Sequence, residues 1–71
     1  MNAHLVKDLE RLKAQILRVA AAVEENVRKS VRALRELSQE HAADVVFNDK
    51  KIDEMEVETE EECLKILALH Q

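Results

Sequence analysis

The residues of this chain with the clearest chemical potential are the carboxylates of FNDKKIDEMEVETEEE, residues 47–62. When Val45 is taken as zero and each helical residue advances by about 100°, Val45, Ile52 and Cys63 mark the centre of an apolar arc. Some of the carboxylates fall beside this arc and are predicted to face the buried side. This inner group consists of Asp49, Asp53, Glu56 and Glu60.

Carboxylates on a buried face need compensation. An unpaired buried carboxylate is costly, so it is protonated, paired with a base or bound to a cation. Like charges four residues apart on a helix also repel each other. Arg28 or Arg32 is a candidate ion-pair partner for Asp49, whereas one metal ion would compensate several carboxylates at once. Ligation by carboxylates alone suits Mg, Ca, Mn or an oxygen-bridged iron cluster, and the residues by themselves leave both interpretations open.

The other potentially reactive side chains have simpler interpretations. Cys63 lies at the centre of the apolar arc and is predicted to be a core thiol. The histidines are interpreted as structural or solvent-exposed. The remaining carboxylates of the segment fall on the far side of the helix and are predicted to be solvated; they are Glu54, Glu58, Glu61 and Glu62.

Two long helices must position these groups. In the first half, apolar residues recur every three or four positions from Leu5 to Leu34, which predicts one helix over residues 3–36. The pattern breaks at residues 37–39, where Ser38 is a good N-cap. A second apolar stripe follows and predicts a helix over residues 40–69.

The short turn makes the two helices antiparallel neighbours. The sequence therefore predicts an all-α fold, a single long helical hairpin over residues 1–71. Two helices cannot cover each other's wide apolar arcs, and small chains usually need further support. We expect the hairpin either to dimerise into a four-helix bundle or to form part of a three-helix bundle.

Composition and charge exclude several functions. The chain has no Gly and no Pro, and 46% of its residues are apolar, which indicates long helices rather than disorder. No apolar run approaches the ~20 residues needed to cross a bilayer, and no signal-peptide pattern or pair of cysteines indicates secretion. We therefore expect a cytoplasmic protein that is not inserted into a membrane.

The net charge of −4 argues against a nucleic-acid-binding role. The basic residues lie mainly in the first half and the acidic residues in the second, which suggests that the halves lie against each other. The basic ridge around Arg28 and Arg32 has no aromatic stacking partners. The sequence also has no nucleophile–base pair, no Gly-rich phosphate loop and no His-containing metal triad, so we do not expect an enzyme.

The segment VVFNDKKIDEMEVETEEECLKILALHQ, residues 45–71, resembles the second helix of the PhoU family of phosphate-transport regulators. That helix typically reads V-I-x-x-D-x-x-I-D-x-x-E-x-x-I-E-x-x-C-L-x-L-L-A-L-x-Q. Residues 9–34 resemble the first helix of the family more loosely. The resemblance therefore covers nearly the whole chain.

The resemblance implies a metal site. PhoU proteins are built from two three-helix bundles whose acidic E/D-x-x-x-D motifs hold iron or zinc clusters. In this chain the motif corresponds to Asp49 and Asp53, and Glu56 follows at a further acidic position of the family pattern. Asn48 stands where many relatives have another acid, which weakens the case for a multinuclear cluster.

The resemblance also implies a role and partners. Family members act in the cytoplasm, where they couple the phosphate-specific ABC transporter to a sensor histidine kinase and restrain the phosphate-starvation response. Relatives continue beyond the position of Gln71 with a third helix, so residues 1–71 are expected to form an incomplete bundle. The alternative is a structural hairpin that forms a homodimer through its apolar arcs and binds no ligand.

Overall fold

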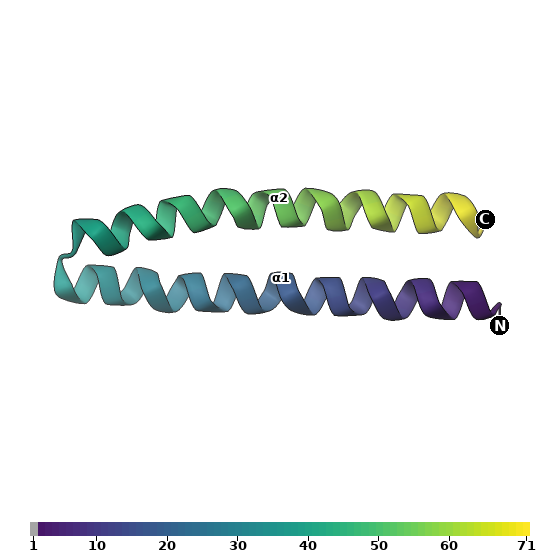
Figure 1. The fold of residues 1–71 in the computed structure, drawn as a ribbon, viewed down its shortest axis with the longest axis horizontal. Helices are drawn as coiled ribbons and strands as arrows, with labels where there is room; N and C mark the ends of the chain where they lie inside the picture. The colour runs from purple at the N-terminus through teal and green to yellow at the C-terminus, as the bar shows by residue number, and fades with distance from the viewer. Residues whose placement is uncertain (1) are drawn as a thin grey trace.

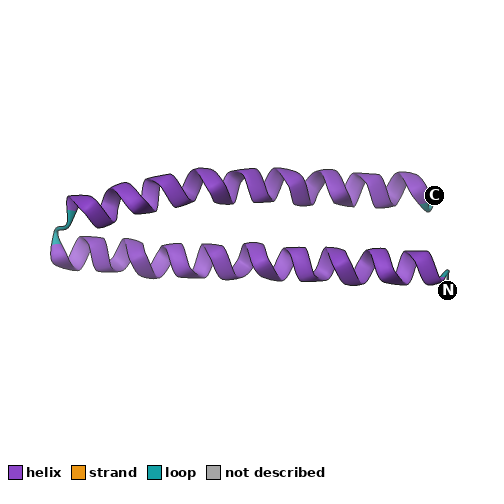
Figure 2. Ribbon diagram, viewed as in Figure 1, coloured by secondary structure: helices purple, strands orange, loops and turns teal. Residues whose placement is uncertain are grey.

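The computed structural model describes residues 2–71 as two long helices, α1 (Ala3–Glu36) and α2 (Gln39–Leu69). They run antiparallel side by side, with both termini at the same end (Figure 1). The molecule measures 52 × 16 × 11 Å along its principal axes. Within the described residues there is only helix and loop (Figure 2). The predicted all-α helical hairpin is thus confirmed.

Each helix begins at a side-chain cap. The Oδ1 atom of Asn2 accepts a hydrogen bond from the backbone N–H of His4 at 2.8 Å. The Oγ atom of Ser38 accepts one from the N–H of His41 at 3.1 Å, which agrees with the N-cap predicted for Ser38. The second helix starts at Gln39, one residue earlier than expected, because the residue that follows an N-cap is already helical.

The turn between the helices consists of Leu37 and Ser38. Leu37 has left-handed backbone angles (φ 49°, ψ 42°), a conformation that costs about 1–2 kcal/mol for a residue with a Cβ atom. Its N–H bonds to the carbonyl of Leu34, and the N–H of Ser38 bonds to the carbonyl of Ala33 at 3.1 Å. These two bonds form a Schellman motif, which satisfies the last carbonyls of α1 and reverses the chain.

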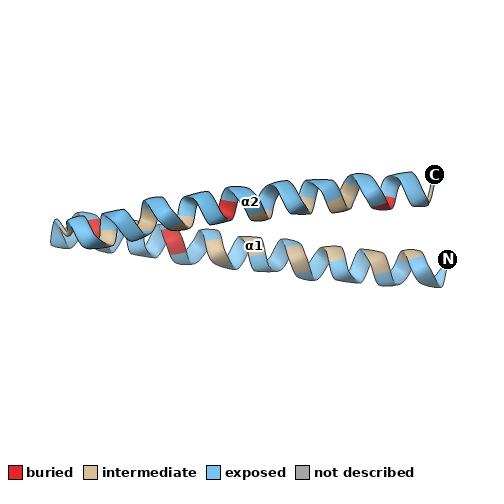
Figure 3. Cartoon of the chain, turned by 45° about the horizontal axis from the view of Figure 1, so that its top comes forward, coloured by how far each residue is buried: buried red, intermediate tan, exposed pale blue. Residues whose placement is uncertain are grey.

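The seam between the helices follows a seven-residue repeat. Ala33, Ile52 and Ile66 are the buried apolar residues, and Asn26 is buried with them. These residues and the half-buried ones lie on the facing sides of the two helices (Figure 3). The repeat places Leu5, Leu12, Val19, Asn26 and Ala33 on α1, and Val45, Ile52, Thr59 and Ile66 on α2.

Most of the predicted apolar stripe of α1 lies outside this seam. Ile16 is 47% exposed, Val27 56% and Leu34 76%. The seam takes Leu5, Leu12 and Val19 from the stripe and adds the small residues Ala22 and Ala33, which allow the helices to approach closely. Each helix therefore packs through one edge of its stripe and leaves the other edge in water, as expected for two helices without a third partner. Neither helix of the described chain contains a stretch long and apolar enough to span a membrane.

Candidate functional site

A shallow hollow of about 390 Å³ lies along one face of the hairpin, mostly in the half nearer to the turn. We call it the acidic groove. Its α1 wall is mainly apolar, and its α2 wall carries three of the predicted inner carboxylates. The residues that line it are Val23, Asn26, Val27 and Ser30 from α1, and Val45, Val46, Asp49, Ile52, Asp53 and Glu56 from α2.

The carboxylates predicted to face the buried side of the helix are not buried, so this prediction is wrong. Asp49, Asp53, Glu56 and Glu60 are all exposed, although the first three line the groove. The seam of α2 is rotated toward Asn48, Met55 and Thr59, which are half-buried. This rotation keeps these four carboxylates hydrated at the rim, which avoids the cost of burying them unpaired. Glu62, which was expected on the solvated side, is instead half-buried, so that part of the prediction is wrong.

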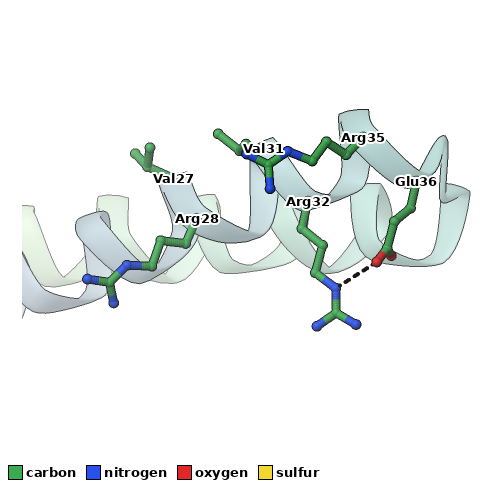
Figure 4. Close-up of a pocket in the computed structure, with 6 residues that line it drawn as sticks. All are labelled: Val27, Arg28, Val31, Arg32, Arg35 and Glu36. Carbon is green, nitrogen blue, oxygen red and sulfur yellow. Dashed lines mark hydrogen bonds and ion pairs between the residues drawn. The ribbon is translucent and has the colours of Figure 1, made fainter.

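The candidate ion pair between Asp49 and Arg28 or Arg32 does not form within residues 2–71. Within residues 2–71 the arginine ion pairs lie inside α1: Arg28 Nη2 is 2.7 Å from a carboxylate oxygen of Glu24, and Arg32 Nε is 3.1 Å from one of Glu36. Figure 4 shows Arg32 directed toward Glu36, in a second shallow hollow near the turn that Val27, Arg28, Val31 and Arg35 also line. Neighbours four residues away on the same helix are reached with less loss of side-chain freedom than a partner across the seam.

The chain does not by itself gather a complete metal-ligand set. Across residues 2–71, no three His, Cys, Asp or Glu side chains are arranged so that together they hold a metal ion. Asp49, Asp53 and Glu56 nevertheless lie on one wall of one groove, and carboxylate oxygen is a suitable donor for hard and borderline cations. The donor chemistry therefore fits a metal, but a closed coordination shell requires oxygen ligands from outside these two helices.

Asn26 is a groove residue that the sequence reasoning missed. Its side chain is buried, with 8% exposure, and its Nδ2 atom donates a hydrogen bond to the carbonyl oxygen of Val45 at 3.1 Å. Its Oδ1 atom is buried without a hydrogen-bond partner in the described chain. The sequence does contain a signal for this position, because Asn26 continues the seven-residue spacing of Leu12, Val19 and Ala33 and therefore belongs in the seam.

The three histidines and Cys63 do not line the groove. His70 Nε2 is 3.0 Å from Asp8 Oδ2 at the open end of the hairpin, so His70 has a structural contact. His41 Nε2 is 3.3 Å from Glu36 Oε2 beside the turn, and His4 is exposed. Cys63 is a free thiol of intermediate exposure rather than a fully buried core residue.

Comparison with known proteins gives one family. A sequence model of the PhoU domain matches residues 16–71. The phosphate-specific transport system accessory protein PhoU homolog of Aquifex aeolicus is 37% identical over 94% of this chain, and PhoU homolog 2 of Thermotoga maritima is 30% identical over 97% of it. The accessory protein PhoU of Escherichia coli K12 is 28% identical over 90% of it.

These relatives are longer than the chain. The matched region spans 30% of the Aquifex protein, 29% of the Thermotoga protein and 27% of the Escherichia protein. No solved structure matches this chain.

Proposed function

The chain belongs to the PhoU domain family, and from this premise we propose that it is an accessory, regulatory component of a phosphate-transport system. The observation that carries the proposal is the family match over residues 16–71, which includes the whole acidic wall of the groove. The names of the Aquifex and Escherichia relatives describe accessory proteins of phosphate-specific transport. The proposed role is regulatory rather than enzymatic.

The proposed partners follow from this role. The chain would act in the cytoplasm, between the phosphate ABC transporter and a sensor histidine kinase, and would restrain phosphate uptake and the starvation response when phosphate is plentiful. A rigid hairpin suits such an adaptor, because two helices more than 30 residues long hold their exposed side chains at fixed spacings.

Deletion of the gene that encodes this chain tests the role. The expected result is raised expression of phosphate-starvation genes in phosphate-rich medium, with normal expression restored by a plasmid copy. Phosphate uptake measured in the same strains shows whether transport changes as well. Unchanged expression and unchanged uptake would contradict the proposal.

The second element of the proposal is a metal ion, iron or zinc, held by Asp49, Asp53 and Glu56. Its support is the presence of these three carboxylates on one wall of one groove, without a basic partner among the ion pairs of residues 2–71. A bound cation would remove the repulsion between Asp49 and Asp53, which lie four residues apart. Further ligands would come from a segment or protein that covers the groove.

Metal analysis of the chain purified without chelator tests this assignment. The variant Asp49→Asn/Asp53→Asn is expected to lose the bound iron or zinc. The matched variant Glu54→Gln/Glu58→Gln removes two charges of the same helix that do not line the groove, and it is expected to retain the metal. Equal metal content in the two variants would show that the ligand assignment is wrong.

A second candidate is a structural hairpin that forms a homodimer and binds no ligand. The specific observation in its favour is the amount of apolar surface left in water, including Leu34, Val27 and Ile16. Dimerisation into a four-helix bundle would bury these side chains. Light scattering at micromolar concentration tests this candidate, and a folded monomer would contradict it.

A further inference from the structure

Two hollows lie on opposite sides of the seam between α1 and α2. Asn26 and Ile52 line both of them, so these two buried residues form the wall between the hollows. The first hollow is the acidic groove. The second, of about 230 Å³, contains none of the groove carboxylates; its other lining residues are Ala22, Glu25 and Lys29 from α1, and Asn48, Lys51 and Met55 from α2. The three groove carboxylates therefore all lie on one side of the hairpin.

The rotation of α2 about its own axis decides on which side these carboxylates lie. They project from α2 between two apolar edges of the helix. One edge contains Ile52 and Ile66 and is buried in the seam, whereas the other is more than half exposed and consists of Val46, Val57 and Leu64. A rotation of α2 by roughly 150° would bring the second edge into the seam. The carboxylates would then lie on the opposite side of the hairpin.

Asn26 distinguishes between these two rotations. Its buried side chain donates a hydrogen bond from Nδ2 to the carbonyl oxygen of Val45 at 3.1 Å. In an α-helix that carbonyl also accepts the backbone N–H four residues on, which here belongs to Asp49. The amide is thus joined to the turn of α2 that carries the first carboxylate. Rotation of α2 onto its other apolar edge would carry the Val45 carbonyl away from Asn26 and break the bond.

The other polar contacts between the two halves of the described chain lie far from this level. Asp8 contacts His70 at the open end, and Glu36 contacts His41 beside the turn. Asn26 occupies a seam position that is apolar in the neighbouring repeats on α1. A polar residue at such a position fixes the alignment of the helices at a cost in stability. The amide therefore indicates a requirement for one defined rotation rather than for maximum stability.

We propose that Asn26 is a positioning residue for the metal ligands of the acidic groove. Its hydrogen bond to Val45 holds α2 at the rotation that places Asp49, Asp53 and Glu56 together on one side of the hairpin. It thereby sets the side from which the remaining oxygen ligands approach. The inference rests on the proposed metal site, because the side on which the carboxylates lie matters to that site only if they hold a cation.

A nitroxide label on α2 measures the rotation without any metal. The label is attached to Asp53→Cys in a chain that also carries Cys63→Ser, so that one thiol is present. A nitroxide broadens the NMR signals of nearby methyl groups, with a steep dependence on distance. The methyl groups of Val23 and Val27, which line the acidic groove, are expected to broaden more than that of Ala22, which lines the other hollow. Equal broadening on the two sides would overturn the proposal.

The variant Asn26→Leu in the same labelled chain tests the role of the amide. The difference in broadening between the two sides is expected to be lost, although urea unfolding shows no loss of stability. Val19→Leu is the matched control, because it places the same residue at the seam position seven residues earlier and leaves Asn26 in place. It is expected to retain the difference. Retention of the difference in Asn26→Leu would overturn the proposal, since the amide would then affect stability alone.

Mn²⁺ added alone gives a readout at the metal site itself. This ion is paramagnetic and is suited to carboxylate ligands. In the unlabelled chain it is expected to broaden Val23 and Val27 more than Ala22, and in Asn26→Leu to broaden both sides alike. Stronger broadening of Ala22 in the unlabelled parent chain would overturn the proposal.

The two experiments also separate failure of the metal site from failure of the positioning role. If Mn²⁺ broadens no signal while the labelled chains behave as expected, the metal assignment is wrong and the positioning of the carboxylates by Asn26 is supported. If Mn²⁺ broadens the groove signals equally in the parent and in Asn26→Leu, the metal site is supported and the positioning role is overturned. Circular dichroism of every variant first establishes that its helix content equals that of the parent.

Discussion

The side chain of Asn26 reaches across the seam and donates a hydrogen bond from Nδ2 to the carbonyl oxygen of Val45, at 3.1 Å. The contact lies nearer to the turn than to the open end of the hairpin, between residues 19 positions apart in the sequence. The same orientation of the amide buries its Oδ1 atom, which has no hydrogen-bond partner in the described chain. A single polar residue at a core position of a helical seam typically fixes the alignment of the helices while it reduces stability.

Replacing Asn26 by Leu is therefore expected to raise the free energy of unfolding by about 1–2 kcal/mol, because it removes the unsatisfied acceptor and adds apolar burial. The measurement is urea-induced unfolding followed by circular dichroism. Asn26→Ala is the matched control and is expected to be less stable than Asn26→Leu, because it leaves a gap in the seam. A loss of stability in Asn26→Leu would mean that the hydrogen bond outweighs the buried acceptor.

The contact between Asp8 and His70 is expected to hold the open end of the hairpin together. These side chains are 21% and 16% exposed, and their atoms lie 3.0 Å apart across 62 residues of sequence. Asp8→Ala should lower the hydrogen-exchange protection of the first turns of α1 and the last turns of α2, with a loss of about 1 kcal/mol. Protection near the turn should not change.

Glu10→Ala is the control for this prediction, since Glu10 is exposed and forms no ion pair within the described residues. It should leave exchange at both ends as in the parent. Equal loss of protection in the two variants would indicate a general effect of charge near the N-terminus.

Ser38→Ala is expected to destabilise the hairpin by about 1 kcal/mol, because it removes the acceptor for the N–H of His41 at the start of α2. Thermal unfolding measures the effect. Ser30→Ala is the comparison: the Ser30 Oγ donates to the carbonyl of Asn26 within α1, and this bond does not replace any missing helical bond. Ser30→Ala should be neutral or slightly stabilising, since Ala is the better helix former.

Asp49→Asn is expected to raise stability in metal-free buffer by roughly 0.2–0.5 kcal/mol, because Asp49 has a like charge, Asp53, four residues ahead and no ion-pair partner in the described chain. Glu54→Gln is the control and is expected to have no effect or the opposite one, since Glu54 follows Lys50 and Lys51 at helical spacing. Urea unfolding compares the two. A lower stability of Asp49→Asn would reveal a cationic partner for this carboxylate.

Much of the hairpin could be predicted from local sequence patterns. The apolar repeat from Leu5 to Leu34 indicates the extent of α1, Ser38 marks the start of α2, and the absence of Gly and Pro lets both helices run unbroken. These signals are local, because helix propensity and capping depend on residues within a few positions of one another. The acidic motif at Asp49 and Asp53 was also visible in the sequence, and its role as a metal ligand stays a prediction.

Only the tertiary structure decided how far each helix is rotated about its own axis. Both helices carry apolar arcs wider than one partner can cover, so the sequence allows several seams. The seam that forms uses the small residues of α1 and the amide of Asn26, and it leaves Ile16 and Val27 in water. The same rotation moves Asp49 and Asp53 from the expected buried side to the rim of a groove. The rotation of each helix depends on the sum of contacts across both helices and on the cost of burying unpaired charge. A local sequence pattern does not contain this information, because both quantities involve residues far apart in the sequence.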